Sequence, residues 1–528
     1  MRAETRRDDL GDIDGDVTLD STPHHYHSPV PAGAETGPGT ERPASVAGVR
    51  VQNRPPTRGR RRAPLPRYAF GPKPKRRTEF VLLLFGSGIV VALYVITSLG
   101  QNSKIPADIS PFLGIVLGLA LAAHMANRWL VPDANAVVLP VAALLNGIGY
   151  VVIARWNGAV VPGTNVHPYI GEARNQALWT AIGVGAYVLT LLIVRHSRDL
   201  ERYRYLLLLL AGVLLVLPLA FSPINGARLW VHLGSIRFQP VELSKILLCI
   251  FFASYFAENK ELLTIPTAQI GNRLYLDPRP LLPILVAWGA TMAIIGLEDD
   301  IGFAALLFVL FIGMLWIATG RVGYLVLGLV LFGVGAFIAA HYFGQVHIRV
   351  EAWQNPWQTA TNYNNNGYQL RQAWFSMGTG GVGGTGLGLD NFTSYIPELT
   401  SDMIFAAIGT ELGLVGAIAV VLAFVLLVGA GFRIAQAARS DFSRLMATGL
   451  TLIIGFQAFF IMAGVVRLLP FTGVTLPFVA YGGSSLVSNY ILIALLLRIS
   501  DEGAKAQREM LAAGAAGGPG ERPMVPAG

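Results

Sequence analysis

Apolar residues gather in runs of about 20 residues along most of the chain, and an α-helix of about that length crosses the hydrocarbon core of a bilayer. Polar and charged residues are concentrated in the stretches between these runs. The runs lie near residues 80–100, 110–128, 135–154, 175–195, 203–221, 240–257, 280–297, 301–320, 322–342, 403–431, 446–468 and 484–498. This pattern predicts an all-α polytopic membrane protein with about 12 transmembrane helices.

The composition agrees with a membrane protein and argues against several other classes. Hydrophobic residues make up 53% of the 528 residues and charged residues only 14%, with a mean hydropathy of +0.51. Cys249 is the only cysteine, which excludes a disulfide framework or a zinc ribbon within the chain. Because the sequence has neither a GxxxxGK[ST] loop nor a Rossmann fingerprint, ATP-driven transport by this chain alone is disfavoured.

Basic residues in the short loops predict the orientation, because Lys and Arg are retained on the cytoplasmic side of a membrane. A basic cluster from Arg58 to Arg77 precedes the first run, so the amino terminus is predicted to be cytoplasmic. Counting onward places the basic turns 195–204 and 433–444 and the carboxyl terminus on the same side. The other side then receives four polar segments, which are 222–239, 298–300, 343–401 and 469–483.

The longest polar segment, 343–401, is predicted to be a large extracellular loop that covers an active site. It is rich in glycine and aromatic residues and ends beside Asp402, where an apolar run begins. A segment of this length without evident secondary structure is uncommon unless it is functional or disordered. Glu411 follows nine residues after Asp402, inside the apolar run that begins there, and we expect the two carboxylates to lie on roughly the same face of that span.

Two further groups of ionisable residues stand in or beside apolar runs, where such residues are costly and therefore candidates for function. Glu242 and Lys245 are three residues apart and lie on one helical face, so a structural salt bridge and a ligand-binding role are equal alternatives. Glu298, Asp299 and Asp300 are adjacent at an outer boundary. They could hold a divalent cation or form a solvated turn, and the solvated turn is slightly favoured for the first two.

Several stretches, taken together and in this order, resemble the SEDS family of cell shape and division proteins, which includes RodA and FtsW. They are FQPVELSK, LEDDIGFA, GYQ with the glycine-rich run after it, IPELTSDMIFAAIGTELG and LLPFTGVTLPFVAYGGSS. The resemblance implies a ten-helix glycosyltransferase core over residues 135–502 and two additional helices over 80–134, as in RodA-like proteins of actinobacteria. Residues 1–79 and 503–528 are poor in long aliphatic side chains and are predicted to be disordered cytoplasmic tails, the first of them basic.

The resemblance implies a peptidoglycan glycosyltransferase of the cytoplasmic membrane that polymerises lipid II at the outer face, for cell elongation and cell shape. It also implies a class B penicillin-binding protein as the partner that supplies transpeptidation. The essential aspartate of the family pattern LPExHTD falls on Asp402. The sequence departs from the family at Thr400 and Ser401, at Ala480, and at 298–303, where the family has QPDLGT.

The chemistry of the implied reaction suits these residues. A carboxylate such as Asp402 could act as general base on the acceptor sugar hydroxyl. Lipid pyrophosphate leaves as a stable anion, so it needs charge compensation rather than the second, proton-donating carboxyl group of glycosidases. The substrate-binding residues that we predict are Arg228, Glu242, Lys245, Arg349, Gln369, Gln372 and Glu411, and the predicted ligand of a Mg²⁺ or Mn²⁺ ion is Asp300.

Other classes of function remain open at this point. A lipid II translocase would use the charged residues inside the membrane as a polar track and would need no external base. A noncatalytic membrane scaffold of the cell-wall synthesis complex needs neither. A secondary transporter would fit the number of spans, yet the sequence shows no evident inverted pair of interrupted helices.

Overall fold

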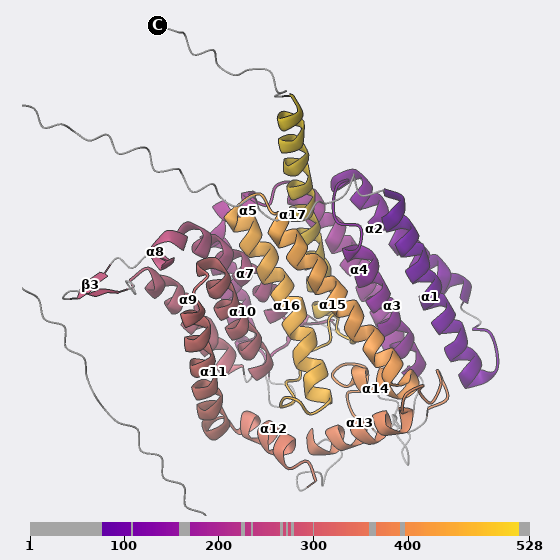
Figure 1. Ribbon diagram of the computed structural model, residues 1–528. Helices are drawn as coiled ribbons and strands as arrows, with labels where there is room; N and C mark the ends of the chain where they lie inside the picture. Colours follow the sequence, from indigo (N-terminus) through magenta and orange to yellow (C-terminus); the bar gives the residue numbers. More distant parts are fainter. Residues whose placement is uncertain are drawn as a thin grey trace, which may run out of the picture. The chain divides into compact units, whose positions relative to one another are not determined.

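The computed structural model describes residues 76–106, 109–157, 169–222, 228–233, 236–264, 268–270, 273–275, 279–298, 300–357, 366–390 and 396–516. Figure 1 shows that these residues form a largely helical structure. Residues 1–75, in which most of the predicted amino-terminal tail falls, lie outside the described residues, as do 517–528 at the other end.

The helices follow one another with few strands between them. In the first half of the chain they are α1 (Arg76–Asn102), α2 (Ile109–Leu130), α3 (Val138–Trp156), α4 (Glu172–Ile193), α5 (Asp199–Arg202), α6 (Arg204–Val216), the 3₁₀ turn η1 (Leu217–Ala220), α7 (Val241–Glu258) and α8 (Lys260–Thr264). In the second half they are η2 (Arg279–Leu281), α9 (Leu282–Leu297), α10 (Ile301–Thr319), α11 (Val322–Tyr342), α12 (Gly344–Gln354), α13 (Asn366–Gly380), α14 (Ile404–Glu411), α15 (Gly413–Ala437), α16 (Asp441–Val465) and α17 (Gly483–Ala516).

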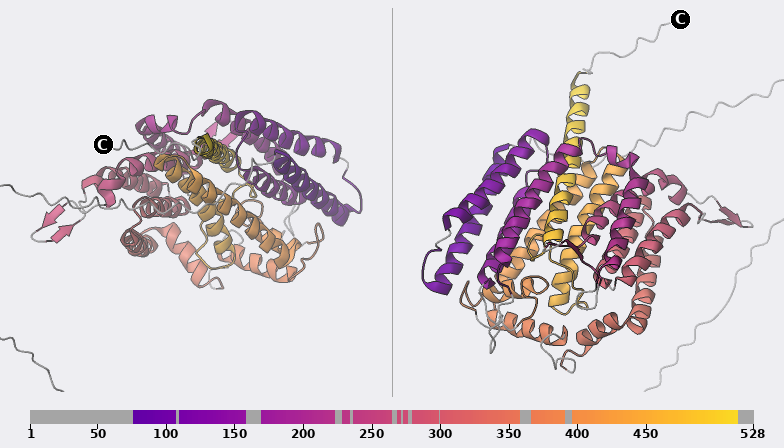
Figure 2. Two further views of the ribbon diagram at one scale, coloured as in Figure 1. Left: turned by 45° about the horizontal axis from the view of Figure 1, so that its top comes forward. Right: turned by 180° about the vertical axis from the view of Figure 1, so that it is seen from behind.

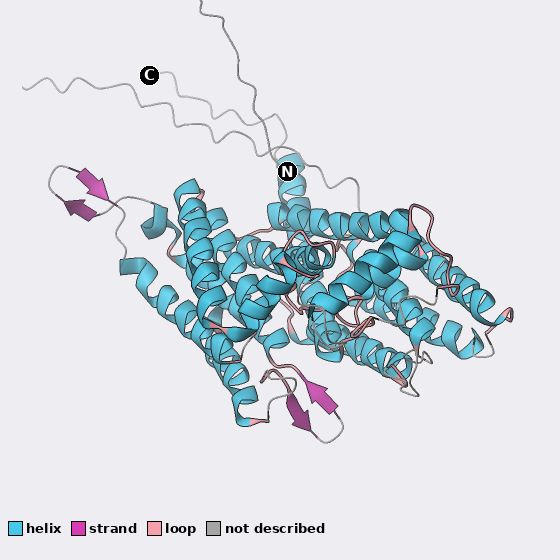
Figure 3. Cartoon of the chain, turned by 90° about the horizontal axis from the view of Figure 1, so that it is seen from below, coloured by secondary structure: helices cyan, strands magenta, loops and turns pink. Residues whose placement is uncertain are grey.

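The sheet structure in the described part of the chain consists of two antiparallel hairpins (Figure 3). Strands β1 (Val231–Leu233) and β2 (Ile236–Phe238) pair in the segment before α7. Strands β3 (Ala268–Ile270) and β4 (Arg273–Tyr275) pair between α8 and α9. The predicted all-α class is therefore confirmed in its essentials, since the described strands are three residues long and pair only within these two hairpins.

Nine of the described helices are long and apolar enough to cross a membrane, by length and composition. They are α1, α2, α3, α4, α10, α11, α15, α16 and α17. Two further apolar helices are shorter, at 204–220 and 282–297, and α7 carries Glu242, Lys245 and Glu258. Each predicted run thus has a helix, which confirms a multi-pass membrane protein, while the total of about 12 spans stays a prediction.

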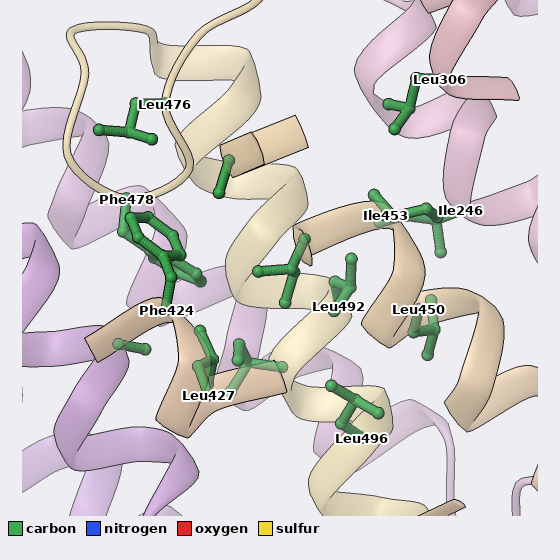
Figure 4. Packing of buried hydrophobic residues seen from close by; sticks show 14 of the residues in the cluster. Ile246, Leu306, Phe424, Leu427, Leu450, Ile453, Leu476, Phe478, Leu492 and Leu496 are labelled. Carbon is green, nitrogen blue, oxygen red and sulfur yellow. The ribbon is translucent and has the colours of Figure 1, made fainter. Parts of the chain in front are cut away.

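The packed interior lies where α7, α10, α15, α16 and α17 meet (Figure 4). Almost every residue of α7 is buried, whereas only 6% of the apolar window of α11 is covered by protein. Cys249 of α7 is buried and packs so closely on α16 that a Cβ atom on Gly449 would overlap its sulfur. The labelled side chains in this interior include Ile246, Leu306, Phe424, Leu427, Leu450, Ile453, Leu492 and Leu496.

Three predicted boundaries need correction. The segment 343–401 is not without secondary structure, because it contains α12 and α13, which run across the end of the helices opposite to the projecting end of α17 (Figures 1 and 2). The predicted span 403–431 is two helices, because the chain turns at Gly413, whose φ of +67° is a left-handed value.

The carboxyl-terminal tail was predicted to begin at 503, yet α17 continues to Ala516. Its polar end is held against loops of the helical unit. Asp501 accepts a hydrogen bond from the backbone N–H of Asp133 at 2.9 Å, and Glu502 accepts one from the N–H of Ser197 at 2.7 Å. Arg508 forms an ion pair with Asp133. These contacts explain why a segment with few aliphatic residues remains helical.

Candidate active site

Asp402 lies in a tight turn, 397–403, immediately before α14. Its backbone N–H donates to the carbonyl of Glu398 at 3.1 Å, and the N–H of Met403 donates to the same carbonyl at 3.1 Å. Glu398 has a φ of +51°, which a non-glycine residue rarely adopts. A backbone held in such a conformation requires support from the surrounding structure.

That support comes from two tyrosines on other elements. The hydroxyl of Tyr169 donates to the carbonyl of Ile396 at 2.9 Å and accepts from the N–H of Leu399 at 3.3 Å. The N–H of Tyr481 donates to the carbonyl of Thr400 at 2.8 Å. The turn that carries Asp402 is therefore fastened on both sides rather than free to swing.

The carboxyl group of Asp402 is half-buried and interacts electrostatically with Glu398, Arg349 and Asp300. Burial, reinforced by the negative charges of Glu398 and Asp300, raises the pKa of Asp402 to about 7, while the positive charge of Arg349 opposes this rise. A carboxyl group that titrates near neutrality can accept a proton at physiological pH and hold it, which is the property of a general base.

Arg349 projects from α12 and reaches the loop before α17. Its guanidinium donates to the carbonyl of Thr472 at 2.6 Å, and a Cβ atom on Gly473 would lie 3.3 Å from it. The φ of Gly473 is +70°, so glycine allows both the turn and the close approach of the arginine. The positive charge of Arg349 thus acts on both Asp402 and Asp300.

Glu298 and Asp300 are buried, so the solvated turn favoured for Glu298 is wrong. Glu298 is 1% exposed, and within the described part of the chain neither of its carboxylate oxygens has a hydrogen-bond partner. Asp300 accepts a hydrogen bond from the N–H of Phe303 at 3.1 Å through Oδ1 and caps α10, while its Oδ2 has no partner among the residues that the structure describes. Burial is the first cause that raises the pKa of Glu298 to about 8 and that of Asp300 to about 6.

Packing explains this burial. A Cβ atom on Gly302 would overlap Val474 and would lie 2.8 Å from the carbonyl of Thr472, so the loop before α17 closes directly over the start of α10. From the other side, the N–H of Arg228 donates to the carbonyl of Glu298 at 3.3 Å. Asp299 lies outside the described residues. No group of three or more His, Cys, Asp or Glu side chains in the described residues is arranged to hold a metal ion.

The four polar segments that were predicted to share one face meet here. Arg228 comes from 222–239, Asp300 from the turn 298–300, Arg349 from 343–401, and Thr472 from 469–483. Asp402 stands at the end of the third of these segments. The structure therefore brings Asp402, Asp300, Arg349 and Arg228 of the predicted site residues to one end of the helical unit.

Glu242 and Lys245 form a fully buried ion pair on α7, with exposures of 1% and 0%. The ammonium of Lys245 also donates to Oε1 of Gln457 at 2.8 Å and lies 5.6 Å from the centre of the Phe303 ring. Ser488 donates to Glu242 at 3.1 Å. A substrate can reach neither charge in this arrangement, so the structure favours the salt-bridge alternative.

This buried pair is nevertheless connected to the site. The charge of Glu242 acts on Asp300, and Gln457 donates to the carbonyl of Thr475 at 3.0 Å, in the loop before α17. The pair therefore supports two of the segments that surround Asp402.

Glu411 does not share a helical face with Asp402, and the prediction is wrong, because nine residues are about two and a half turns and would separate the two side chains even in a continuous helix. It ends α14, whereas Asp402 precedes that helix. Its carboxylate pairs with Arg155 of α3 at 3.2 Å and accepts from the N–H of Gly388 at 3.4 Å. Glu411 is thus a buried anchor at the other end of α14 from Asp402.

Gln369 and Gln372 lie one turn apart on α13, which packs beside α14. Gln369 is buried and Gln372 half-buried. Neither glutamine is among the groups that act on the charge of Asp402, which are Glu398, Arg349 and Asp300. The structure therefore places the two side chains on the helix beside α14 and not among these charged residues.

Sequence reasoning missed several residues of this region. Glu398 and Thr472 gave no signal, because an exposed glutamate and a backbone carbonyl look ordinary in a polar loop. Gln457 and Arg155 could have been found, because a polar residue within an apolar run is costly unless it has a partner. Gln457 interrupts the run 446–468 and Arg155 closes the run 135–154.

Comparisons with known proteins agree on one family. A family model described as "Cell cycle protein", built on FtsW, RodA and SpoVE, matches residues 135–505. The chain is 38% identical over 435 residues to peptidoglycan glycosyltransferase RodA of Mycobacterium tuberculosis, which covers 81% of this chain and 91% of the relative. The RodA of Mycobacterium leprae is 37% identical over 430 residues, with the same coverage.

A solved structure shows the same fold. It was described as "Structural coordination of polymerization and crosslinking by a peptidoglycan synthase complex", and it shares 22% sequence identity and a TM-score of 0.54 with this chain. The match covers 70% of this chain and 98% of that chain. The alignments to the mycobacterial relatives cover more of this chain than residues 135–505 and all the residues after 505 together. They therefore include part of the chain before residue 135.

Proposed function

The chain belongs to the FtsW, RodA and SpoVE family of cell cycle proteins, and we propose that it is a peptidoglycan glycosyltransferase that polymerises lipid II at the outer face of the cytoplasmic membrane. Its relatives of 38% and 37% identity carry the name peptidoglycan glycosyltransferase RodA. The observation that carries the proposal is Asp402, a half-buried carboxyl group with a pKa raised to about 7, fastened where four polar segments converge.

Asp402 acts as the general base in this proposal. The 4-hydroxyl of the acceptor N-acetylglucosamine attacks the anomeric carbon of the donor N-acetylmuramic acid, and the bond from that carbon to the pyrophosphate oxygen breaks. Asp402 takes the proton of the attacking hydroxyl. The electron pair of the broken bond leaves with the lipid pyrophosphate, so no second carboxyl group has to donate a proton.

Positive charge next to Asp402 stabilises the departing pyrophosphate. The charge of Arg349 acts on both Asp402 and Asp300, and Arg228 is exposed beside Glu298. Preorganised cations of this kind stabilise charge that develops in a transition state. Their arrangement around a proton acceptor is what a glycosyl transfer with an anionic leaving group requires, and a translocase would have no use for the proton acceptor.

The oxygens of Asp300 and Glu298 for which the described residues provide no partner fit a divalent cation, because Mg²⁺ and Mn²⁺ prefer carboxylate oxygens. When bound, such an ion would supply further positive charge for the pyrophosphate. Glu298, with a pKa raised to about 8, would have to lose its proton first, so binding should strengthen as the pH rises.

We assign the remaining predicted residues supporting roles. Glu242 and Lys245 hold Asp300 and the loop before α17 in place. Gln369 and Gln372 lie on the helix beside α14, where they could contact sugar or peptide groups of the substrate. The mycobacterial relatives are named RodA, which supports a role in elongation and cell shape. Cytoplasmic termini and a class B penicillin-binding protein as transpeptidase partner are part of the same proposal.

Purified protein incubated with lipid II in detergent, with and without Mg²⁺ or Mn²⁺, tests the proposal. We expect glycan strands on a gel from the wild-type protein and none from Asp402→Asn. Transfer of lipid II across vesicle membranes without glycan formation would instead support the translocase alternative. A wild-type protein that binds its transpeptidase partner, yet forms no glycan with that partner present, would support the scaffold.

A further inference from the structure

The outer end of α1 touches the glycine-rich turn that follows α13. A Cβ atom on Gly100 of α1 would overlap the carbonyl of Leu387, and a Cβ atom on Gly388 would overlap the carbonyl of Thr97. Backbone therefore meets backbone in both directions, and only the absence of two side chains permits it. Gly388 has a φ of +78°, so this position favours glycine for its conformation as well.

The same turn is fastened to α14. The N–H of Gly388 donates to the carboxylate of Glu411 at 3.4 Å, and the N–H groups of Thr385 and Gly386 donate to the carbonyls of Thr410 and Glu411 at 2.9 and 3.2 Å. Instead of forming a flexible flap, the glycine-rich turn is a tight strap across the end of α14. Asp402 stands just before the other end of this eight-residue helix.

A second connection runs through Arg155 at the end of α3. Gln101 of α1 donates through Nε2 to the carbonyl of Arg155 at 3.0 Å. The guanidinium of Arg155 pairs with Glu411 at 3.2 Å and donates to the carbonyl of Asp390 at 2.5 Å. The last turn of α1 therefore contacts both partners of the Glu411 carboxylate, which are the glycine-rich turn at Gly388 and Arg155.

The inner end of α1 is fixed by a buried polar group. Glu79 of α1 contacts His124 of α2 and accepts from Asn127 of α2, both at 3.1 Å. Tyr187 of α4 donates to Asn127. In this apolar setting such a group is costly unless its members remain paired, so it fixes how far α1 extends along the core. The position of the outer end of α1 follows from this.

We propose that the α1–α2 pair is a positioning element of the active site, in which the last turn of α1 sets the place of α14, and hence of Asp402, through the 385–390 strap and Arg155. The pair precedes the residues that the family model matches, 135–505. The pair is therefore an addition to the family core, and the geometry of the active site in this chain depends on it. This inference rests on the proposed function of Asp402.

Two matched substitutions on the same helix test the proposal. Gly100→Val inserts a side chain against the strap, whereas Gly88→Val places the same side chain where nothing lies within 4 Å. Both replace glycine by valine within α1, so their intrinsic effects on helix propensity are similar. We expect kcat for glycan polymerisation to fall about tenfold or more in Gly100→Val with KM changed less than about twofold, because small displacements of a catalytic group are that costly. Gly88→Val should stay within about twofold of the wild type.

Hydrogen exchange supplies a readout that does not depend on activity. In Gly100→Val the amides of 385–390 and 404–411 should exchange faster, while those of α7 and α16 remain as in the wild type. Equal rates in the two valine variants, or faster exchange across the whole chain in Gly100→Val, would overturn the proposal. An inactive wild-type protein would instead contradict the proposed function, so the two failures are distinguishable.

A milder variant covers the case in which Gly100→Val does not fold. Gln101→Leu keeps the size of an exposed side chain and removes only its bond to Arg155. We expect a loss in kcat of about threefold or more, with the melting temperature unchanged. Full activity of Gln101→Leu, together with unchanged exchange at 404–411, would show that α1 does not position α14.

Discussion

The charge of Glu398 offers a test in which activity should rise rather than fall. Glu398 is exposed and accepts a hydrogen bond from the hydroxyl of Ser401 at 2.9 Å. After burial, its negative charge is the largest cause of the raised pKa of Asp402. Glu398→Gln keeps the shape of the side chain and removes its charge. The pKa of Asp402 should then fall, because a like charge that opposed ionisation is gone.

The size of the effect follows from Coulomb's law with solvent screening. Two unit charges near a protein surface interact with about 1 kcal/mol once screening is allowed for, and this corresponds to about 0.7 of a pH unit. With a starting pKa of about 7, the ionised fraction of Asp402 at pH 6 should rise from about one tenth to about one third. Activity should therefore increase about threefold at pH 6 and remain unchanged above about pH 8.5.

Initial rates of polymerisation from labelled lipid II, measured between pH 5.5 and 9, provide the assay. The midpoint of kcat/KM against pH should lie near 7 for the wild type and lower for Glu398→Gln. The two midpoints should approach each other at high salt, because the charge of an exposed group is screened. Ser401→Ala, which leaves the charge of Glu398 in place, serves as the control. A midpoint that does not move, or that moves upward, would refute this account of Asp402.

Three further predictions follow from the same site. Asp402→Asn should lower the polymerisation rate by at least about 100-fold, and a wild-type rate in a gel assay would refute the general-base role. The same substitution should raise the melting temperature at neutral pH, because a carboxyl group whose pKa is raised from 3.8 to about 7 destabilises the folded state as the pH rises through that range. Chelation of divalent cations should abolish most activity and added Mg²⁺ or Mn²⁺ should restore it, whereas indifference to chelator would remove Asp300 as a ligand. Glu242→Ala or Lys245→Ala should lower the free energy of unfolding by about 3 kcal/mol or more, measured by thermal unfolding. Exchange of the two charges should recover folding but not the full polymerisation rate; a charge-swapped protein with the wild-type rate would show that the pair is purely structural.

The sequence by itself determined the membrane-spanning character of the chain and the end at which its chemistry lies. In a bilayer, backbone groups must be satisfied within each segment, so a run of apolar residues of sufficient length specifies a helix with no information from elsewhere in the chain. The alternation of polar segments then predicted which loops lie together, and Arg228, Asp300, Arg349 and Asp402 do meet. Asp402 stood out because its surroundings in the sequence are distinctive.

Only the tertiary structure decided which partner each charge has. Glu411 looked like a companion of Asp402, yet it pairs with Arg155, 256 residues away in sequence. Glu298 looked solvated, yet the loop around Thr472 and the segment at Arg228 cover it. Pairing and burial depend on residues brought together from distant parts of the chain, and the free energy of a buried charge depends on those neighbours. A local sequence pattern therefore predicts that a charged residue is functional or paired, while the packing of other helices around it determines which partner and role it has.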